Sequence, residues 1–521
     1  MGTYVNPGFQ NLAYDRSDEF YVDKSMLIPI LNERINSRNR FLCVSRPRRF
    51  GKTMAANMIA AYYSKGCDSH EVFSGLNVTK DPSFESNINK YNVIQLDMND
   101  IMTNRGSGTA CAFINKRVVG ELKEIYPFVN MDYSLGIALQ DIFKFTGHRF
   151  VIIIDEYDVI IRDKRYSGER DEYLDMLVSV FKSSLTSQAI ALAYMTGIMP
   201  IIREKTESKL NNFTEYTMLD ADVMAPFVGF TEKDAEMLAE KGGIDFSEIK
   251  RWYDGYIVNG IEIYSPKSVI TAVSRQQCDD YWTQTGSYNI LRDYILLDMD
   301  GIRRDVISMI GGARVPVNIR KFNNTPWEIH SRDDVFTYLI HLGYLSYDKS
   351  EKVCFIPNSE LMSEWVSVVE DAPDYNSLLT CIRDSKMLLE ATWNMDEASV
   401  AEGVRKAHME LDSLLQYNNE ATFQCVIRLA YFYAGAYYTI VSELPSGDGF
   451  ADIALIPYKP DIPAIIIELK KDRSADSALE QIRKRQYPKA LEKYKGNLLM
   501  VGISYGSKTK EHFCRIEKAP V

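Results

Sequence analysis

Short apolar segments separated by helix-forming stretches dominate the first two hundred residues. Residues 41–44 and 150–154 are continuous apolar runs, and residues 92–97 and 190–197 supply two further strand candidates. A strand that helices cover on both faces shows no polar alternation, and the run at 150–154 shows none. Strands that alternate with helices, such as the helix expected at 54–63, predict a parallel doubly wound sheet.

The middle of the chain changes to helices and one hairpin. Residues 231–241 have helical spacing, and another helix is expected at 333–341. Residues 343–348 and 352–357 then predict a hairpin, and a helix followed by a hairpin indicates a winged helix. Such a module can bind DNA, but we expect it to pack against the core because its surface is not strongly basic. Its acidic residues are Asp333, Asp334, Asp348 and Glu351.

Composition places the chain among ordinary soluble globular proteins. Its 521 residues are 46% hydrophobic and 25% charged. This length predicts two to four domains. The eight cysteines show neither zinc-site spacing nor a dense disulfide framework. Residues 1–10 lack a signal-like pattern and the apolar runs are too short to span a membrane, so we expect a cytoplasmic protein without membrane contact.

The first candidate site follows the strand at 41–44. The loop Ser45–Thr53 ends in Gly51-Lys52-Thr53 and precedes a helix, the order found in a phosphate-binding P-loop. Lys52 would reach the β- and γ-phosphates of ATP and Thr53 would bind Mg²⁺. Arg46 replaces the first glycine of the usual P-loop pattern G-x-x-x-x-G-K-[ST]. The alternative to a P-loop is a basic turn before a helix, with Lys52 in solvent. The other candidate nucleotide-binding residues of the loop are Arg48, Arg49, Phe50 and Gly51.

A second strand supports this interpretation. The run at 150–154 ends in Asp155-Glu156, as a Walker B strand does. Asp155 would hold Mg²⁺ and Glu156 would orient or deprotonate the attacking water. Thr196 ends the strand at 190–197 and would contact the γ-phosphate. The alternative for Asp155 and Glu156 is a core strand that ends in a solvated acidic loop. The alternative for Thr196 is a strand-end hydroxyl that caps the next turn.

Five motifs together resemble a known family. They are Tyr21–Ser25, Ser45–Thr53, Asp155–Asp158, Thr196-Gly197 and Trp252–Tyr256. Together they resemble the bacterial predicted AAA-ATPase-like family that carries a C-terminal PD-(D/E)XK nuclease domain. In that family Arg-Pro-Arg-Arg-Phe-Gly-Lys-[Ser/Thr] is the usual phosphate loop, so the resemblance implies that Arg46 is a family feature. The resemblance also includes Tyr264–Pro266 and Tyr281–Gly286, which are expected to be aromatic core residues around tight turns.

The second candidate site lies in the last hundred residues. A helix is expected from 419 to 433, and strands are expected at 437–443, 452–457 and 464–470. Asp452 and Glu468 would hold Mg²⁺ or Mn²⁺, which prefer oxygen ligands. Strand alternation places Lys470 on the face of Glu468, where it can orient or activate water. The alternative is a solvated, salt-bridged strand face.

The resemblance implies further residues around this site. Glu420 would be an additional metal ligand on the preceding helix, and Gln481 and Tyr487 match the family's Gln…Tyr pair. Gln481, Arg483, Lys484 and Tyr487 are the candidate nucleic-acid contacts. The alternative for the basic helix is a solvated face balanced by Glu480 and Glu492. Phe450 stands where many relatives have arginine, so one phosphate or salt-bridge contact is absent.

We therefore predict a P-loop AAA-ATPase-like domain at 1–220, a helical lid and winged-helix-like region at 221–370, and a PD-(D/E)XK nuclease-like α/β domain at 371–521. The expected function is ATP binding and hydrolysis coupled to metal-dependent cleavage of nucleic acid, with DNA favoured. Because the formal charge is −11, contact with nucleic acid would need a local basic surface. The alternative is a regulatory or scaffolding ATPase whose nuclease-like domain binds without cleaving. Oligomeric state does not follow from the sequence, and Arg48, Arg49 and Arg203 are the arginine-finger candidates.

Overall fold

The computed structural model describes residues 2–519 apart from 202, 205–206, 209, 283–287, 297–298, 326, 416–419, 447–448, 485–490, 492–493 and 495. Side chains at 203–204, 207–208, 288–290, 412–415, 420–421, 443–446 and 449–451 also lie outside this description. The chain forms two compact units: Met1–Gln284 with Pro316–Glu360, and Thr285–Val315 with Leu361–Val521. The three predicted domains divide the chain differently and stay a prediction.

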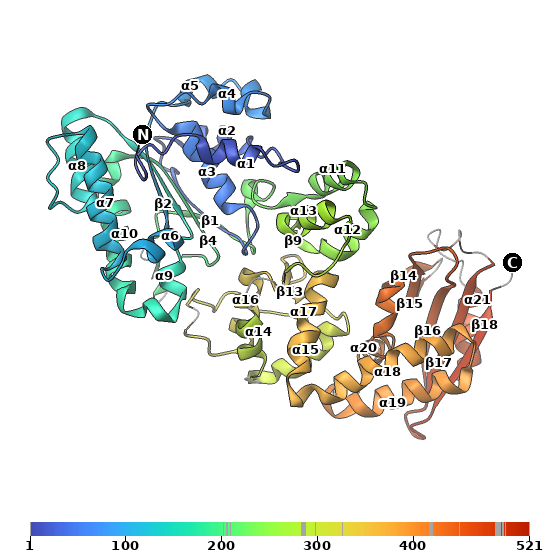
Figure 1. Cartoon of the computed structure of the whole chain (residues 1–521). Coiled ribbons are helices and arrows are strands. Elements are labelled where there is room, and N and C mark those ends of the chain that lie inside the picture. Colours follow the sequence, from blue (N-terminus) through green and yellow to red (C-terminus); the bar gives the residue numbers. More distant parts are fainter. Residues whose placement is uncertain are drawn as a thin grey trace. The chain divides into compact units, whose positions relative to one another are not determined.

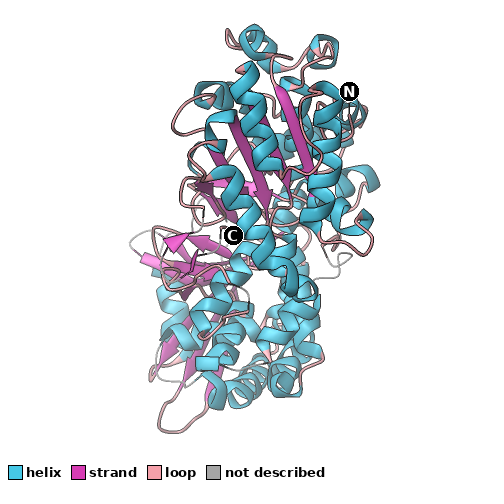
Figure 2. Ribbon diagram, turned by 90° about the vertical axis from the view of Figure 1, so that its left-hand side faces the viewer, coloured by secondary structure: helices cyan, strands magenta, loops and turns pink. Residues whose placement is uncertain are grey.

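A parallel five-stranded sheet is the centre of the first unit. Its order is β2-β3-β4-β1-β7, and every neighbouring pair is parallel, which confirms the predicted doubly wound sheet. Helices cover both faces (Figures 1 and 2), so the strands are buried and apolar. The strands are β1 (Phe41–Ser45), β2 (Asn92–Asp97), β3 (Phe150–Asp155), β4 (Ile190–Gly197) and β7 (Thr214–Tyr216).

The helices around this sheet follow apolar periodicity and end at recognisable caps. Thr109 and Ser134 cap the backbone at the starts of α7 and α8, and Gly147 ends α8 in the left-handed conformation. In Figure 1, α7, α8 and α10 lie on one side of the sheet and α1 to α3 on the other. The helices are α1 (Gln10–Arg16), α2 (Leu27–Arg34), α3 (Lys52–Tyr63), α4 (His70–Phe73), α5 (Phe84–Asn87), α6 (Met98–Asn104), α7 (Ala110–Ile125), α8 (Leu135–Thr146), α9 (Val159–Arg162) and α10 (Arg170–Phe181).

A small lid-like subdomain follows in the same unit. Thr231 and Asp234 form a reciprocal capping box at the start of the helix predicted at 231–241, which the structure confirms. Its sheet has the order β8-β10-β9, and the short strands β5 and β6 pair separately. The elements are β5 (Arg203–Glu204), β6 (Glu207–Ser208), β8 (Phe230–Thr231), α11 (Glu232–Gly242), α12 (Phe246–Tyr253), β9 (Tyr256–Val258), β10 (Ile261–Tyr264) and α13 (Pro266–Arg275).

The predicted helix and hairpin at 333–357 are also present. They are α16 (Arg332–Leu342), β12 (Ser346–Asp348) and β13 (Val353–Phe355), and the hairpin joins β11 (Val315–Pro316) in a three-stranded sheet. Ser331 caps α16 by accepting from the backbone N–H of Asp334. Several aromatic side chains of this region are fully buried, including Tyr344, which agrees with a packing role.

The second unit contains a mixed five-stranded sheet of order β14-β15-β16-β17-β18. Only β16 and β17 are parallel, and α21 forms the crossover between them. The elements are α14 (Tyr288–Ile295), α15 (Ile302–Ile310), α17 (Ser359–Glu370), α18 (Asn376–Trp393), α19 (Glu397–Leu415), α20 (Glu420–Ala430), β14 (Tyr438–Ser446), β15 (Gly449–Pro457), β16 (Ala464–Lys471), α21 (Ala475–Lys484), β17 (Leu498–Tyr505) and β18 (His512–Lys518).

Two details differ from the sequence expectation. The helix expected to run to Tyr433 ends at Ala430 and is followed by a 3-10 turn, and the strand expected from Asp452 begins at Gly449. Pairing with β14 extends that strand, a contact that the local pattern does not show. No helix among the described residues is long and apolar enough to cross a membrane.

Candidate functional site

The loop between β1 and α3 turns sharply at Gly51. Its φ of +85° lies in the left-handed region that favours glycine, and α3 begins at the next residue, Lys52. The Lys52 ammonium donates to the carbonyl oxygens of Arg46 and Pro47 at 3.2 and 3.0 Å. A helix N-terminus with a folded-back lysine concentrates positive potential at one point, as binding of a polyphosphate requires.

Two hydroxyl side chains, those of Thr53 and Thr196, contact the carboxylate of Asp155. The Thr53 hydroxyl donates to Asp155 Oδ2 at 2.6 Å, and the Thr196 hydroxyl donates to Oδ1. The carboxyl ends of parallel strands lie at one sheet edge, which explains why β3 and β4 bring Asp155 and Thr196 together. Burial raises the pKa of Asp155, although both hydroxyl donors lower it. A hydroxyl beside a buried carboxylate is a donor set that fits Mg²⁺.

Glu156 lies between two cations. Its Oε1 is 3.2 Å from Lys52 Nζ and its Oε2 is 3.3 Å from Arg162 Nη2. Burial raises the pKa of Glu156, but Lys52 and Arg162 outweigh burial, and the net pKa is lowered. The carboxyl is therefore held as a carboxylate. Its backbone has a φ of +52°, which is uncommon for a residue with a side chain.

The arginines of the loop differ in position. Arg46 is completely buried and donates to Val228 O at 3.3 Å and Ser45 O at 2.9 Å, and burial lowers its pKa to about 10. Arg48 is exposed, whereas Arg49 donates to Tyr281 O at 3.5 Å. The structure therefore places the Arg46 side chain inside the protein, where it supports the loop backbone.

Aromatic residues of the lid support the same loop. Phe50 is buried, with its ring 5.5 Å from Tyr256 and 6.5 Å from Trp282 in edge-on geometry. The Tyr256 hydroxyl donates to Gly343 O at 2.6 Å. Gly255 has a φ of +104°, and a Cβ there would lie 2.1 Å from Pro357 O. The residues around Tyr256 are therefore aromatic core, and they pack against Phe50 of the P-loop.

The second candidate site lies on β15 and β16. Glu468 is 1% exposed, and its Oε1 accepts from Lys470 Nζ at 2.9 Å and from Gln481 Nε2. Asp452 Oδ2 accepts from the Leu469 N–H at 2.6 Å, so this carboxylate lies beside the Glu468–Leu469 link. Glu468 and Lys470 therefore share one strand face, as strand alternation predicts, and the Asp452 carboxylate contacts the backbone between them.

A close helix–sheet approach brings Gln481 to Glu468. Gly502 on β17 pairs with Glu468 on β16, and a Cβ on Gly502 would lie 2.5 Å from Ala475 O. A larger residue would push α21 away from the sheet. Glycine is therefore required at Gly502 for the Gln481 contact.

Other residues expected around this site are partly outside the description. Tyr487 lies outside the described residues, as do the side chains of Glu420 and Phe450. Arg483 pairs with Glu517 on β18, and Lys484 is exposed. Within the described part of the chain, no group of three or more His, Cys, Asp or Glu side chains could hold a metal. Asp452 and Glu468 supply oxygen donors suited to Mg²⁺, and water would complete such a site.

Comparison with protein families now separates the two sites. Residues 8–206 match the family described as predicted AAA-ATPase, and residues 418–513 match the PD-(D/E)XK nuclease superfamily. The chain carries a domain of each. The resemblance drawn from the motifs is confirmed for both domains. Lys52, Asp155 and Thr196 lie in the AAA-ATPase domain, and Asp452, Glu468 and Gln481 lie in the PD-(D/E)XK domain.

Individual proteins add little to this. An uncharacterized protein in the vnfD 5′ region of Azotobacter chroococcum mcd 1 is 26% identical over 305 residues. The match covers 55% of this chain and 55% of that protein, so the chain spans about half the length of this relative. A structure of the Aeropyrum pernix ORC2 protein in ADPNP-ADP complexes aligns with 68% of this chain and 97% of its own length, at 10% identity and a TM-score of 0.30. A score this low supports no inference about this chain.

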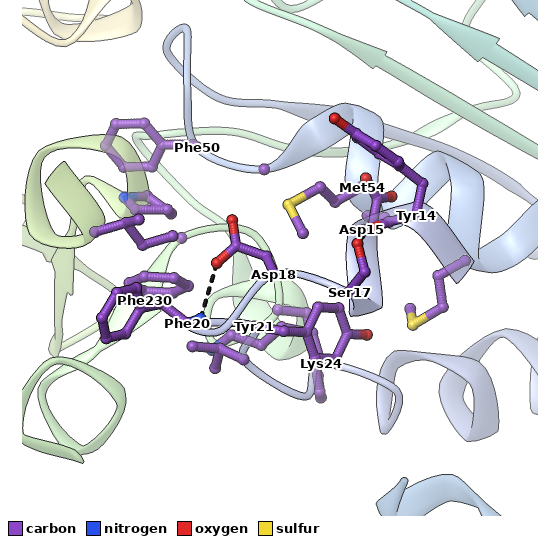
Figure 3. Close-up of a pocket in the computed structure, with 18 residues that line it drawn as sticks. Tyr14, Asp15, Ser17, Asp18, Phe20, Tyr21, Lys24, Phe50, Met54 and Phe230 are labelled. Carbon is purple, nitrogen blue, oxygen red and sulfur yellow. Dashed lines mark hydrogen bonds between the residues drawn. The ribbon is translucent and has the colours of Figure 1, made fainter. Parts of the chain in front are cut away.

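A cavity of about 410 Å³ lies in the first unit, beside the P-loop of the AAA-ATPase domain. Figure 3 shows Phe50 and Met54 on one side, and Asp18, Phe20 and Phe230 around the space. Its wall includes eight residues between Tyr14 and Lys24, a segment that precedes the P-loop in the sequence. The motif Tyr21–Ser25 is the only sequence signal for this wall.

Lys24 closes one side of that cavity. Its ammonium donates to Asp234 Oδ2 at 2.5 Å and to Pro226 O at 2.8 Å. Burial lowers the pKa of Lys24, while Asp234 opposes the shift. The pair ties the N-terminal segment to the start of α11. Lys24 belongs to the motif Tyr21–Ser25, but the sequence assigns it no role, and Arg162 is a functional candidate that the sequence analysis did not single out.

Proposed function

We propose that the protein binds and hydrolyses ATP, and that the nucleotide controls metal-dependent phosphodiester hydrolysis of DNA by the C-terminal domain. The two family matches support the coarser function of an ATPase joined to a nuclease-like domain. The cleavage reaction, the DNA substrate and the coupling are the proposed part.

Three neighbouring features support ATP as the first ligand. Lys52 stands at the N-terminus of α3, where a triphosphate is favoured. Thr53 and Asp155 would hold Mg²⁺, which neutralises phosphate charge when bound. The cavity beside Gly51 has the size and largely apolar lining that a nucleoside requires. Phosphate and base sites would then share the same turn.

Glu156 and Thr196 have the positions that ATP hydrolysis would use. Glu156 is a carboxylate beside Lys52 and can accept a hydrogen bond from the attacking water. Thr196 contacts Asp155 and would sense the γ-phosphate from the end of β4. Arg48 and Arg49 flank the loop and would contribute positive charge.

The nuclease proposal rests on one observation. The buried Glu468 carboxylate accepts hydrogen bonds from Lys470 and Gln481, and the Asp452 carboxylate contacts the neighbouring Leu469 N–H. A solvated strand face would not bury an acid this completely. Asp452 and Glu468, with Glu420, would hold Mg²⁺ or Mn²⁺, which activates water and neutralises phosphate charge when bound. Lys470 would orient that water. DNA contacts are proposed for Gln481, Arg483, Lys484 and Tyr487.

Cleavage assays test this function directly. Linear, circular and single-stranded DNA and RNA are incubated with Mg²⁺ or Mn²⁺, with and without ATP. We expect Asp452→Ala to abolish cleavage, and Lys52→Ala to abolish nucleotide binding and the effect of ATP. Asp461→Ala, an exposed acid in the turn between β15 and β16, is the matched control.

Three outcomes separate the possibilities. DNA cleavage that Asp452→Ala removes and Asp461→Ala preserves supports the nuclease. Cleavage that is equal in wild type and Lys52→Ala contradicts the coupling. Absence of metal-dependent cleavage on every substrate favours a regulatory or scaffolding ATPase whose C-terminal domain binds without cutting.

A further inference from the structure

Glu156 is held by two cations that have different surroundings. Lys52 Nζ faces Oε1, and Arg162 Nη2 faces Oε2, at 3.2 and 3.3 Å. Each carboxylate oxygen therefore has its own positive partner. The three side chains are largely buried, with exposures of 3% for Lys52, 14% for Glu156 and 12% for Arg162. Solvent screens such pairs much less than surface pairs.

Arg162 has a second carboxylate as its other partner, whereas Lys52 is otherwise held by the backbone carbonyls of Arg46 and Pro47. The Arg162 Nε lies 3.2 Å from Oδ2 of the buried Asp158, while its Nη2 faces Glu156. Asp158 Oδ2 also accepts hydrogen bonds from the backbone N–H groups of Ile198 and Met199, at 3.2 and 2.9 Å. The planar fork of a guanidinium can serve two carboxylates at once in fixed geometry.

Asp158 in turn connects Arg162 to the end of β4. Gly197 lies against it, because a Cβ there would approach Asp158 Oδ1 to 2.8 Å and Tyr157 to 2.7 Å. The residue before this glycine is Thr196, which donates to Asp155. Arg162 therefore stands in a rigid cluster fixed at both the Asp155 loop and the Thr196 strand.

A bound triphosphate would affect the two cations differently. Lys52 stands at the P-loop, where phosphate oxygens would compete with Glu156 for its ammonium. Asp158 would keep Arg162 in place, and the pKa of Arg162 is raised because Asp158 and Glu156 outweigh the effect of burial. Oε1 of Glu156 can therefore lose its partner Lys52 when ATP binds, whereas Oε2 keeps its partner Arg162.

We propose that Arg162 is a positioning residue for ATP hydrolysis. It holds Glu156 by Oε2, so that Oε1 faces the attacking water once Lys52 turns to the phosphates. This role rests on the proposed ATPase function. The unusual φ of Glu156 fits it, because a backbone in the left-handed region persists only where surrounding contacts hold it.

Steady-state ATP hydrolysis by the full chain tests the proposal. We expect Arg162→Ala to lower kcat on the order of 10²-fold, the lower range for loss of an oriented acid–base group. KM and the affinity for a non-hydrolysable ATP analogue should change by less than about threefold, because the described ion pairs of Arg162 are with Glu156 and Asp158. Arg165→Ala is the matched control, since Arg165 is exposed and its described contacts are with the nearby Asp163 and the ring of Tyr166.

A double-variant cycle distinguishes positioning from a merely structural role. In a Glu156→Gln background, Arg162→Ala should cause no further loss of kcat, because the group on which it acts is already altered. Arg162→Lys keeps a charge for Asp158 and is expected to fold; a point charge cannot hold both carboxylates, so kcat should be intermediate. This second variant keeps the test decisive if Arg162→Ala does not fold.

The opposite results would overturn the role of Arg162. They are a rise in KM at constant kcat, unchanged kcat in Arg162→Lys and Arg162→Ala, or an equal additional loss in the Glu156→Gln background. A wild-type protein that neither binds nor hydrolyses ATP would overturn the proposed function as well. That result is distinguishable because it appears without any substitution.

Discussion

Glu360 is a buried acid whose ionisation should make the stability of the first unit depend on pH. Its Oε1 accepts from the Tyr281 N–H at 2.9 Å and its Oε2 from the Ser268 hydroxyl at 2.9 Å. Burial raises the pKa of Glu360 to about 8, although the backbone donors and Ser268 lower it. Tyr281 and the neighbouring Trp282 contact Arg49 and Phe50 of the P-loop.

The direction follows from comparing the folded and unfolded chains. Between the ordinary pKa of 4.5 and a folded pKa of about 8, only the unfolded chain loses its proton from Glu360. The contribution of the neutral Glu360 carboxyl to the free energy of unfolding is therefore fully present below pH 4.5. It is lost progressively as pH rises toward about 8. A shift of this size corresponds to at most about 5 kcal/mol, which is a large part of the stability of a domain.

Glu360→Gln should remove this dependence. The glutamine amide oxygen can accept from Tyr281 N–H, and its NH₂ can donate to Ser268, so the contacts of the neutral acid are kept. At about pH 8.5 we expect the variant to be more stable than wild type by a few kcal/mol, below the upper limit above. Near pH 4.5 the two should be similar.

Urea unfolding measured by circular dichroism across this pH range provides the assay. Glu370→Gln is the matched control, because Glu370 is an exposed acid at the other end of α17. Parallel pH profiles for wild type and Glu360→Gln would refute the reasoning. They would mean that Glu360 is ionised in the folded protein throughout the range.

Three further predictions concern other parts of the fold. Gly255→Ala should lower the unfolding midpoint of the first unit by the equivalent of about 2 kcal/mol or more, because its Cβ would meet Pro357 O at 2.1 Å at a positive φ; an unchanged midpoint would contradict this. Gly502→Val should abolish the proposed DNA cleavage in the nuclease assay while thermal melting still shows a folded AAA-ATPase domain. The pKa of His512, lowered by burial to about 4 beside His408, predicts that stability of the second unit falls as pH drops from 6.5 toward 4, by at most about 3 kcal/mol; thermal melts of His512→Gln should lose this acid dependence.

The sequence was sufficient for the parts of each site that follow one strand or one turn. Lys52 could be placed because it ends the loop that follows the apolar run of β1, and Asp155 because it ends the apolar run of β3. Strand alternation likewise put Glu468 and Lys470 on one face, and the structure joins them at 2.9 Å. Period and strand end are local properties, so the residues themselves carry them.

Contacts between distant segments could not be predicted in the same way. Asp158 and Arg162 are four residues apart, but the contact that joins Asp158 to the end of β4 is with the backbone N–H of Met199, about forty residues later. Position 255 has no room for a Cβ because Pro357, about a hundred residues later, lies against it. Nothing in the local sequence of Asp158 or Gly255 reveals these distant partners.

Sequence by itself determined the two domain families, the parallel sheet and the carboxylates and lysines at its edges. Tertiary structure alone decided that Arg46 is buried behind the P-loop, that residues 14–24 line the cavity beside it, and that Gln481 reaches Glu468. The physical reason is that burial and charge pairing depend on which distant segments pack together, whereas strand and helix periods depend on the order of neighbouring residues.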